Sequence, residues 1–296
     1  MKFLLKFLAT IFITVTMGYQ CSYDKDLYKL NLYDNYAEYS KNKFCNYSKQ
    51  EFRKTFLGLS AKPISTHNLF YGGYDPTTPI QIDWSKTGAV TGVKDQGACG
   101  SCWAFSATGD MEGTAFTKFG VKRNLSEQNL VDCVVGDFAC QGGLPSDAFD
   151  YVIQNGIQSE FEYKYTAESD ICKYNKDISV FKIDSWVHLP ENETLLASYV
   201  YQNGPVSIGI NANLMQFYDR GIITNVTECD PDSLDHGVLI VGYGEYRKIK
   251  YWKVKNSWGD NWGEHGYFRI IRGKGACGLN KMVTHSIANT TNINVS

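Results

Sequence analysis

Cys102 stands at the start of a strongly helix-forming stretch, and this placement constrains the fold more than any other feature of the chain. Small or apolar residues follow it at spacings of three and four, at Ala104, Ala107, Met111 and Ala115, with good helix formers between them. The pattern predicts a helix from Cys102 to Phe119. A cysteine at a helix N-terminus lies beside unpaired backbone amides and the positive end of the helix dipole, which favour a thiolate. Cys102 is therefore a candidate nucleophile.

A thiol in this setting has three interpretations. Cys99 and Cys102 form a C-x-x-C pair of the kind found in redox proteins, but no thioredoxin-like strand precedes them. Cysteine and histidine together can bind zinc, yet the chain has no second close pair at metal-ligand spacing. A nucleophile would need a proton partner, and His236, in Leu234-Asp235-His236-Gly237-Val238, is the best candidate. By default, however, a lone histidine on an apolar strand is a core residue.

The run Gln96-Gly97-Ala98-Cys99-Gly100-Ser101-Cys102-Trp103 resembles the signature of the papain-like cysteine proteases. The resemblance implies that Cys102 is the nucleophile and that His236, 134 residues further on, is its base. It implies that Asn256 orients the imidazole and that the Trp258 indole shields that contact from water. Gln96 would donate to the developing oxyanion together with the Cys102 N–H. Four separate positions thus agree with one mechanism, that of a cathepsin L-like cysteine endopeptidase.

The cysteine count fits the same mechanism. The chain has nine cysteines, of which seven follow residue 77. An odd number leaves one thiol free or paired elsewhere, and six cysteines can pair in about 15 ways. The resemblance implies one pairing of six of them and leaves Cys102 free. Its bridges are Cys99–Cys140, Cys133–Cys172 and Cys229–Cys277. Whether Cys21 pairs with Cys45 stays open.

Composition places the chain among globular proteins without a strong charge bias. Its 296 residues are 43% hydrophobic and 14% aromatic, enough for a sizeable core, and the formal net charge is -2. Neither this balance nor any basic cluster indicates nucleic acid or an anionic membrane as a partner. We expect no cofactor and no metal. The resemblance implies peptide and protein substrates, the chain's own propeptide and cystatin-like inhibitors as partners, and a monomer.

Residues 1–18 are typical of a secretory signal peptide. Lys2 and Lys6 precede and interrupt an apolar stretch from Phe7 to Val15, with small residues after it. The stretch is too short to span a bilayer, and no other window approaches about 20 apolar residues. We expect the mature protein in a lysosome, in another acidic vacuole or outside the cell. Sequons compatible with that route occur at Asn46, Asn124, Asn192, Asn225, Asn289 and Asn294.

Residues 19–77 are interpreted as a propeptide, and residues 78–296 as the mature peptidase domain. The stretch from Ser40 to Phe52 resembles part of the family's inhibitory prodomain, with Ser40 and Asn46 in place of a Gly and an Asp. Too few residues precede it for the family's long helix, so the prodomain is expected to be shortened. Either the gene model is incomplete, or inhibition is weaker and less dependent on acid, because Asn46 cannot titrate.

The mature region predicts two halves of different character. Helices are expected from Cys102 to Phe119, after a cap at Ser126, before Gly156 and before Gly204. Extended segments are expected at residues 205–212, 237–243, 251–256 and 267–272. A helical half would hold Cys102, a barrel-like half would hold His236 and Asn256, and the active site would lie in the cleft between them. This is the α+β, two-domain architecture of the papain-like proteases.

Family positions carried over residue by residue predict the walls of the substrate cleft. Gly142 and Gly143 would pair their backbone with an extended peptide, as an added strand. An uncharged pocket would receive the second residue before the scissile bond, which predicts a preference for Leu, Val or Met and poor use of Arg. No long insertion follows Cys133 to block the cleft, so internal cleavage is expected. The pocket lining is Leu144, Pro145, Gly209, Leu234 and Met282.

A different class of function is a secreted homologue that binds peptides without cleaving them. Such proteins usually lack the nucleophile or its base, whereas Gln96, Cys102, His236 and Asn256 are all present. An active peptidase is therefore the preferred interpretation, and the peptide-binding homologue is the alternative.

Overall fold

The helix predicted at Cys102 is present and runs through the interior of the molecule. The computed structural model describes residues 29–31, 34–60 and 68–289, and in it α3 spans Cys102–Phe119. Residues 102–115 are all buried, so the helix has no solvent face until its last turns. It ends at Gly120, which adopts the left-handed conformation with φ of 69° and donates to the carbonyls of the last turn.

The other predicted helices are confirmed together with their caps. Ser126 Oγ accepts from the Asn129 N–H at the start of α4, and Gly156 ends α5. The helix predicted before Gly204 is α6, whose cap Asn192 accepts from two backbone N–H groups. The helices are α2 (Lys49–Phe56), α4 (Glu127–Cys133), α5 (Pro145–Asn155) and α6 (Glu193–Asn203), and 3-10 turns lie at Trp84–Lys86, Ala139–Gln141, Lys176–Ile178 and Ala276–Gly278.

The four predicted extended segments belong to one sheet, which has nine strands within the described residues. Its order is β1-β5-β8-β7-β6-β4-β9-β3, with β2 beside β6, and all neighbours are antiparallel except β5 and β8. The strands are β1 (Ala37–Tyr39), β2 (Ile82–Asp83), β3 (Ser185–His188), β4 (Val206–Ile210), β5 (Tyr218–Ile223), β6 (His236–Tyr246), β7 (Ile249–Lys255), β8 (Tyr267–Ile271) and β9 (Val283–Ile287).

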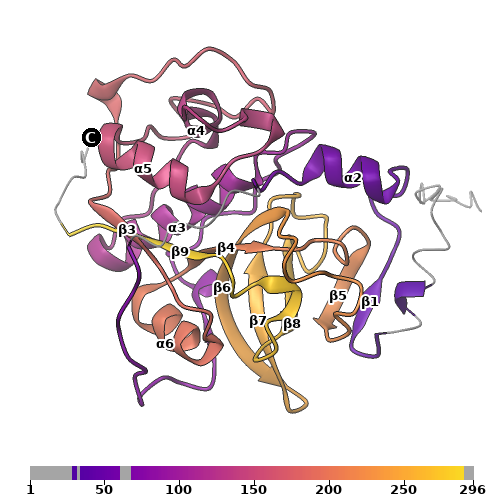
Figure 1. Ribbon diagram of the computed structural model, residues 1–296. Helices are drawn as coiled ribbons and strands as arrows, with labels where there is room; N and C mark the ends of the chain where they lie inside the picture. The colour runs from indigo at the N-terminus through magenta and orange to yellow at the C-terminus, as the bar shows by residue number, and fades with distance from the viewer. Residues whose placement is uncertain (1–28, 32–33, 61–67, 290–296) are drawn as a thin grey trace, which may run out of the picture.

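Two apolar clusters fill the two halves of the molecule. One surrounds α3, α4 and α5 and includes Trp103 and Phe149, and the other lies on the sheet and includes Trp252 and Phe268. Figure 1 shows α4 and α5 on one side of α3 and the strands β4 to β8 on the other. The halves meet where α3 packs against β6. The predicted helical half and sheet half are therefore both present.

The disulfides implied by the family resemblance are also present. The bridges are Cys99–Cys140, Cys133–Cys172 and Cys229–Cys277, and Cys102 is the free cysteine of the described residues. Because Cys99 is bonded to Cys140, Cys99 and Cys102 are not a redox pair. Cys45 is disulfide-bonded as well. Cys21, the predicted signal peptide of residues 1–18 and the sequon at Asn294 lie outside the described residues.

An N-terminal segment, residues 34–60, packs along the sheet half and reaches the junction between the halves. Its strand β1 pairs with β5, and its helix α2 begins with a capping box formed by Ser48 and Glu51. In Figure 1 this segment is the indigo chain, with α2 above the strands β1 and β5. Within the described residues, no helix has the length and apolar character needed to cross a bilayer.

Candidate active site

Cys102 and His236 lie together at the junction between the two halves. Cys102 is the first residue of α3, and His236 is the first residue of β6. The Gly237 N–H donates to Cys102 Sγ over 3.3 Å, which places the thiol against this strand. A Cβ at Gly237 would lie 3.1 Å from the Cys102 carbonyl oxygen, so glycine permits the close approach. The fold thus brings a candidate nucleophile to a candidate base.

Asn256 and Trp258 hold the imidazole of His236 from its other sides. His236 Nε2 lies 2.8 Å from Asn256 Oδ1, which also accepts from the Ser257 N–H over 2.8 Å. The Trp258 ring stacks on the imidazole with centroids 4.6 Å apart and an angle of 24°. Because Nε2 donates to Asn256, Nδ1 is the nitrogen available to the thiol, and it has no hydrogen-bond partner among the described residues.

Gln96 is held beside the same junction with its amide nitrogen turned toward the N-terminal segment. Its Nε2 donates to the carbonyl oxygens of Phe56, over 3.0 Å, and Cys99, over 2.7 Å. Its Oε1 accepts from Ser257 Oγ over 2.7 Å, and its backbone N–H donates to the Ser257 carbonyl. The loop that carries Gln96 is therefore tied to the residue that follows Asn256. The Phe56 carbonyl oxygen therefore already accepts a hydrogen bond from Gln96 Nε2, the group predicted to donate to the oxyanion.

Residues 57–60 of the N-terminal segment, which we call the cover, cross the cleft over Cys102. Gly143 donates to the Gly58 carbonyl over 3.0 Å and accepts from the Ser60 N–H over 3.0 Å. A Cβ at Gly58 would lie only 1.8 Å from the Gly100 carbonyl oxygen, so only glycine fits there. With the cover in place, Cys102 is 0% exposed. The strand-like pairing predicted for a substrate at Gly143 is made here by the chain itself.

Leu59 of the cover fills the pocket predicted for an apolar substrate side chain. It packs in one cluster with Leu144 and Met282, with Leu234 against them. Gly209 faces the same space, because a Cβ added there would come within 2.8 Å of the Leu59 side chain. Pro145 is buried at the start of α5, and Gly142, with φ of 127°, accepts from the Phe138 N–H. The structure therefore gathers four predicted lining residues around a leucine.

Burial shifts the pKa values of the two catalytic candidates in opposite directions. Burial raises the pKa of the Cys102 thiol to about 11, although N–H groups of Gly237 and Gly58 oppose the shift. Burial lowers the pKa of His236 to about 4, against the opposing effect of its hydrogen bond to Asn256. Between these values both groups are neutral. The covered site therefore holds a thiol and a neutral imidazole, not a thiolate and an imidazolium.

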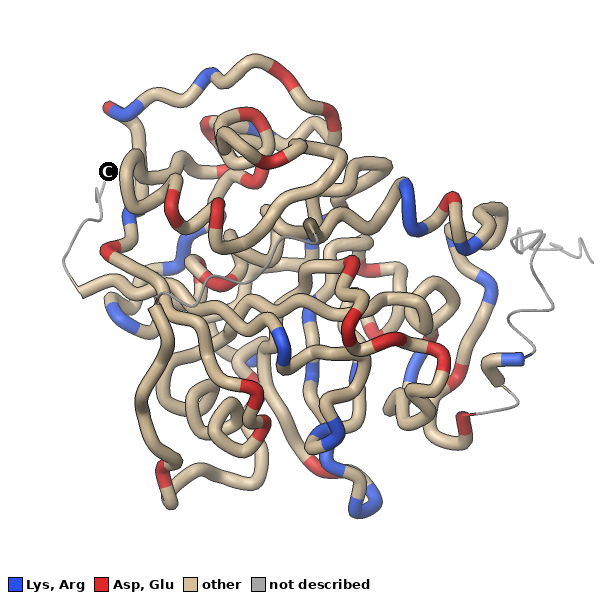
Figure 2. Tube along the Cα trace, in the orientation of Figure 1, with Lys and Arg blue, Asp and Glu red and all other residues tan. Residues whose placement is uncertain are grey.

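Aromatic and ionic contacts anchor the N-terminal segment to the rest of the chain. Phe44 and Phe52 pack edge-on against Trp258, with ring centroids 5.3 and 5.2 Å away. Lys43 Nζ lies 2.7 Å from Asp95, and Arg53 lies 3.0 Å from Asp235. Figure 2 shows the positive residues along this segment and the run of negative residues, 228–235, between β5 and β6.

Three features of the site were missed by sequence reasoning. Leu59 carries no motif, so nothing marked it as the occupant of the pocket. Asp235 stands next to His236, but an acidic neighbour alone did not indicate its ion pair with Arg53. No sequence signal marked the charged residues behind the site, among them Glu127. No group of three or more His, Cys, Asp or Glu side chains within the described residues is placed to hold a metal ion.

Comparison with known proteins yields the same family in sequence and in structure. Residues 78–287 match the family described as "Papain family cysteine protease". The chain is 42% identical to cathepsin F of Mus musculus over 86% of its own length and 55% of the relative, and 41% identical to cathepsin F of Drosophila melanogaster over 85% and 43%. It therefore spans about half the length of these two relatives.

Other matches cover a larger share of the relative's length. The chain is 41% identical to procathepsin L of Mus musculus over 84% of its own length and 77% of the relative. Among solved structures, the digestive procathepsin L 3 of Tenebrio molitor larval midgut superposes with a TM-score of 0.80 at 36% identity, covering 89% of this chain and 88% of the other. The α+β fold with two halves is that of these procathepsins.

Proposed function

The chain belongs to the papain family of cysteine proteases, and from this premise we propose that it hydrolyses internal peptide bonds with Cys102 as nucleophile. The observation that carries the proposal is the arrangement around His236. Its Nε2 is held by Asn256, its ring is covered by Trp258, and its strand places Gly237 against the Cys102 sulfur. This arrangement serves a nucleophile that needs an oriented base.

The proposed reaction begins when the cover leaves the cleft. The Cys102 proton passes to His236 Nδ1, and the thiolate attacks the substrate carbonyl carbon to form a C–S bond. Gln96 Nε2 and the Cys102 N–H donate to the oxyanion. The imidazolium gives its proton to the leaving amine as the C–N bond breaks, which leaves a thioester. Water, deprotonated by His236, then attacks the thioester and releases the acid and the thiol.

We propose that the substrate pocket prefers Leu, Val or Met at the second residue before the scissile bond. Leu59 supports this, because it packs among Leu144, Leu234 and Met282 in the same way that a substrate leucine would. No charged residue belongs to this set, so a buried arginine would lose its hydration without gaining a partner. Trp258, now packed against Phe44, would become available to substrate residues on the other side of the scissile bond.

We propose that residues 19–77 act as an inhibitory propeptide, with the mature enzyme beginning near Thr78. The family match from residue 78 and the position of the cover over Cys102 support this division. Disulfides in all three predicted pairs support a route through the secretory pathway to a lysosome, another acidic vacuole or the exterior. We also expect a monomer that cystatin-like proteins inhibit.

The test is a profile of peptide cleavage by the processed chain, with a Cys102→Ala variant as control. Two fluorogenic peptides that differ only at the second position before the scissile bond, Leu in one and Arg in the other, measure the preference of this pocket alone. We expect hydrolysis of the Leu peptide, at least tenfold weaker use of the Arg peptide, and no hydrolysis by the variant. Cleavage that persists in Cys102→Ala would refute the mechanism. Peptide binding without hydrolysis would favour the alternative, a non-catalytic peptide-binding homologue.

A further inference from the structure

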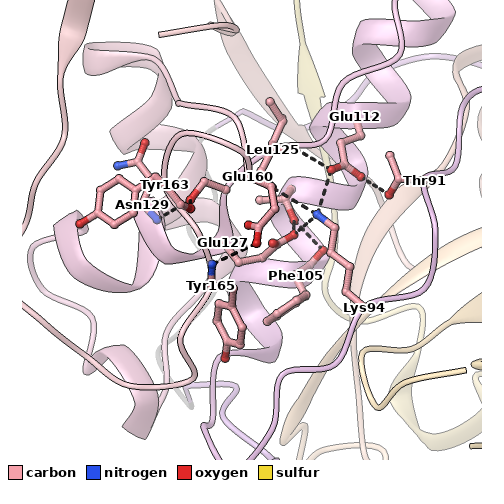
Figure 3. Close-up of polar contacts among 12 residues, drawn as sticks. Thr91, Lys94, Phe105, Glu112, Leu125, Glu127, Asn129, Glu160, Tyr163 and Tyr165 are labelled. Atoms are coloured by element: carbon pink, nitrogen blue, oxygen red, sulfur yellow. Dashed lines mark hydrogen bonds and ion pairs between the residues drawn. The ribbon is translucent and has the colours of Figure 1, made fainter. Parts of the chain in front are cut away.

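Three buried ionisable side chains and one partly buried lysine, Lys94, lie behind the catalytic candidates, where the two halves meet. Lys94 precedes Gln96 by two residues, and Lys255 directly precedes Asn256. The carboxylates facing them come from the helices, Glu112 from α3 and Glu127 from α4. Figure 3 shows the Lys94 ammonium between the two carboxylates. The group therefore connects the helical half to the loops that carry two catalytic candidates.

The two carboxylates differ in how fully they are hydrogen-bonded. Glu112 uses both oxygens: Oε1 accepts from Lys94 Nζ and from the Leu125 N–H, and Oε2 accepts from Thr91 Oγ1. Glu127 Oε1 accepts from Lys94 Nζ over 2.6 Å and from Thr108 Oγ1 over 2.6 Å. Glu127 Oε2 is buried and has no hydrogen-bond partner among the described residues.

Asn256 has a complementary gap. Its Oδ1 serves His236 and the Ser257 N–H, while its Nδ2 is buried without a partner in the described part of the chain. A cavity of about 20 Å³ lies between α3 and the ends of β6 and β7, and Asn256, Glu127, Lys94 and Lys255 all line it. That volume holds one water molecule. Two residues that each have one unpartnered buried atom, Asn256 and Glu127, thus line the same water-sized space.

We propose that this cavity binds a water molecule that bridges Asn256 Nδ2 to Glu127 Oε2, and that Glu127 is thereby a positioning residue for the Asn256–His236 pair. The inference rests on the proposed function for its catalytic meaning. A buried donor or acceptor left unpaired is destabilising, and a buried water with two to four polar partners removes that penalty. The Lys255 ammonium, which donates to Thr91 Oγ1, is a further neighbour available to the same water.

The bridge would fix which way the Asn256 amide points. A half-turn about its last bond exchanges Oδ1 and Nδ2, and the NH₂ would then face the His236 Nε2–H and the Ser257 N–H, both donors. A water that accepts from Nδ2 and donates to a carboxylate favours the observed orientation. Lys94 and Thr108 hold Glu127 from the other oxygen, so the acceptor itself is fixed. The orientation of the imidazole then depends on a helix of the opposite half.

The first test is a crystal structure of the full chain at a resolution that shows ordered water. We expect density in this cavity within hydrogen-bond distance of both Asn256 Nδ2 and Glu127 Oε2. A dry cavity, or a water that contacts only one of the two atoms, would overturn the proposal. This readout does not depend on catalysis, so an inactive processed chain would refute the proposed function and leave the water site to be judged by itself.

The second test compares two variants that remove the same charge from the same group. In Glu127→Gln the amide oxygen stays with Lys94 and Thr108, so an NH₂ donor faces the cavity and the water can no longer donate to residue 127. We expect kcat to fall about 2- to 10-fold with KM unchanged, which is the scale of one hydrogen bond. Glu112→Gln, whose carboxylate has no open oxygen, is the control and should change kcat less than about twofold. Equal losses in both variants would contradict the bridge.

Discussion

Two groups of ion pairs in this molecule both join basic side chains to carboxylates, and they differ in their exposure to water. The pairs that anchor the N-terminal segment lie on the surface, where the side chains of Lys43 and Asp95 are 34% and 48% exposed. The pairs behind the catalytic candidates are buried, with Lys94 19%, Glu112 2% and Glu127 1% exposed. The exposed pairs suit the N-terminal segment, which is proposed to detach. The buried pairs suit the junction behind the catalytic candidates, which must stay in place.

The two groups of ion pairs therefore differ in how much each pair contributes to stability. An exposed pair contributes about 0.2–1 kcal/mol and is screened by salt. Removing one partner of a buried pair costs about 3–5 kcal/mol, because the remaining charge is left without compensation. Most of the binding of the N-terminal segment must therefore come from apolar contacts such as Phe44 on Trp258 and from the backbone pairing at Gly143.

The largest effect is expected for Lys94→Met. The substitution leaves Glu112 and Glu127 buried side by side without the ammonium that bonds both, and we expect a loss of about 3–5 kcal/mol in the free energy of unfolding. Urea unfolding of Cys102→Ala chains, which removes self-digestion, measures it. Lys43→Met is the matched control and should lose less than about 1 kcal/mol. Similar losses for both lysines would erase the distinction between the two groups.

A smaller effect is expected for Gly58→Ala, which disturbs the cover without touching a charge. The added methyl would collide with the Gly100 carbonyl oxygen, and overpacking of this kind costs about 1–3 kcal/mol. Peptide hydrolysis by the intact chain should rise about 5- to 150-fold, while the processed chain is unchanged. Gly92→Ala is the control, since a Cβ there meets no atom within 4 Å. No gain in activity would mean that the cover does not limit access to Cys102.

The smallest effect is expected for Arg53→Ala. Loss of its ion pair with Asp235, in which the arginine is 44% and the aspartate 16% exposed, should raise the activity of the intact chain by less than about fivefold, and high salt should reduce the difference. Lys54→Ala, an exposed neighbour on the same helix, provides the baseline. An increase above about tenfold, or one that high salt does not reduce, would show that this pair contributes more than a surface contact.

Several helices could be predicted from the sequence, because the residues that begin and end each helix lie close to it along the chain. The helix from Cys102, the cap at Ser126 and the stop at Gly204 each depend on residues within one or two turns. β5 was not predicted, because its Asp219, Arg220 and Gly221 break the alternation of apolar and polar residues. Its place in the sheet is set by pairing with β8 and β1, which no local window contains.

The candidate site also contains residues that could be predicted from the sequence and features that could not. Family resemblance indicated Cys102, His236, Asn256 and Gln96, and the structure places them at one junction. The path of the cover could not be predicted, because it depends on contacts between residues 57–60 and partners far along the chain, such as Gly143. The burial of Glu127 was equally hidden, since an acidic residue in the first turn of a helix is ordinarily a solvent-exposed partner of the helix dipole.

Uncovering the site changes the protonation of His236. Its covered pKa of about 4 lies below the ordinary value near 6.5, and return to solvent removes the burial that causes this shift. His236 therefore takes up a proton on uncovering, but the Cys102 thiol gives one up to become the thiolate. The two states then bind equal numbers of protons between about pH 4 and about pH 6.5, so this exchange by itself adds no pH dependence to uncovering. Asn46 cannot add a pH dependence either, because its side chain does not titrate.

The most direct measurement is the rate at which iodoacetamide alkylates Cys102, followed by intact mass from pH 4 to pH 8 in the intact chain and in the chain cleaved before Thr78. We predict that the cleaved chain reacts rapidly even at pH 5, because an uncovered thiolate is paired with an imidazolium. The intact chain should react far more slowly at pH 7, because its covered Cys102 is a buried thiol. Equal rates in both chains at pH 7, or an unreactive Cys102 in the cleaved chain, would contradict the account.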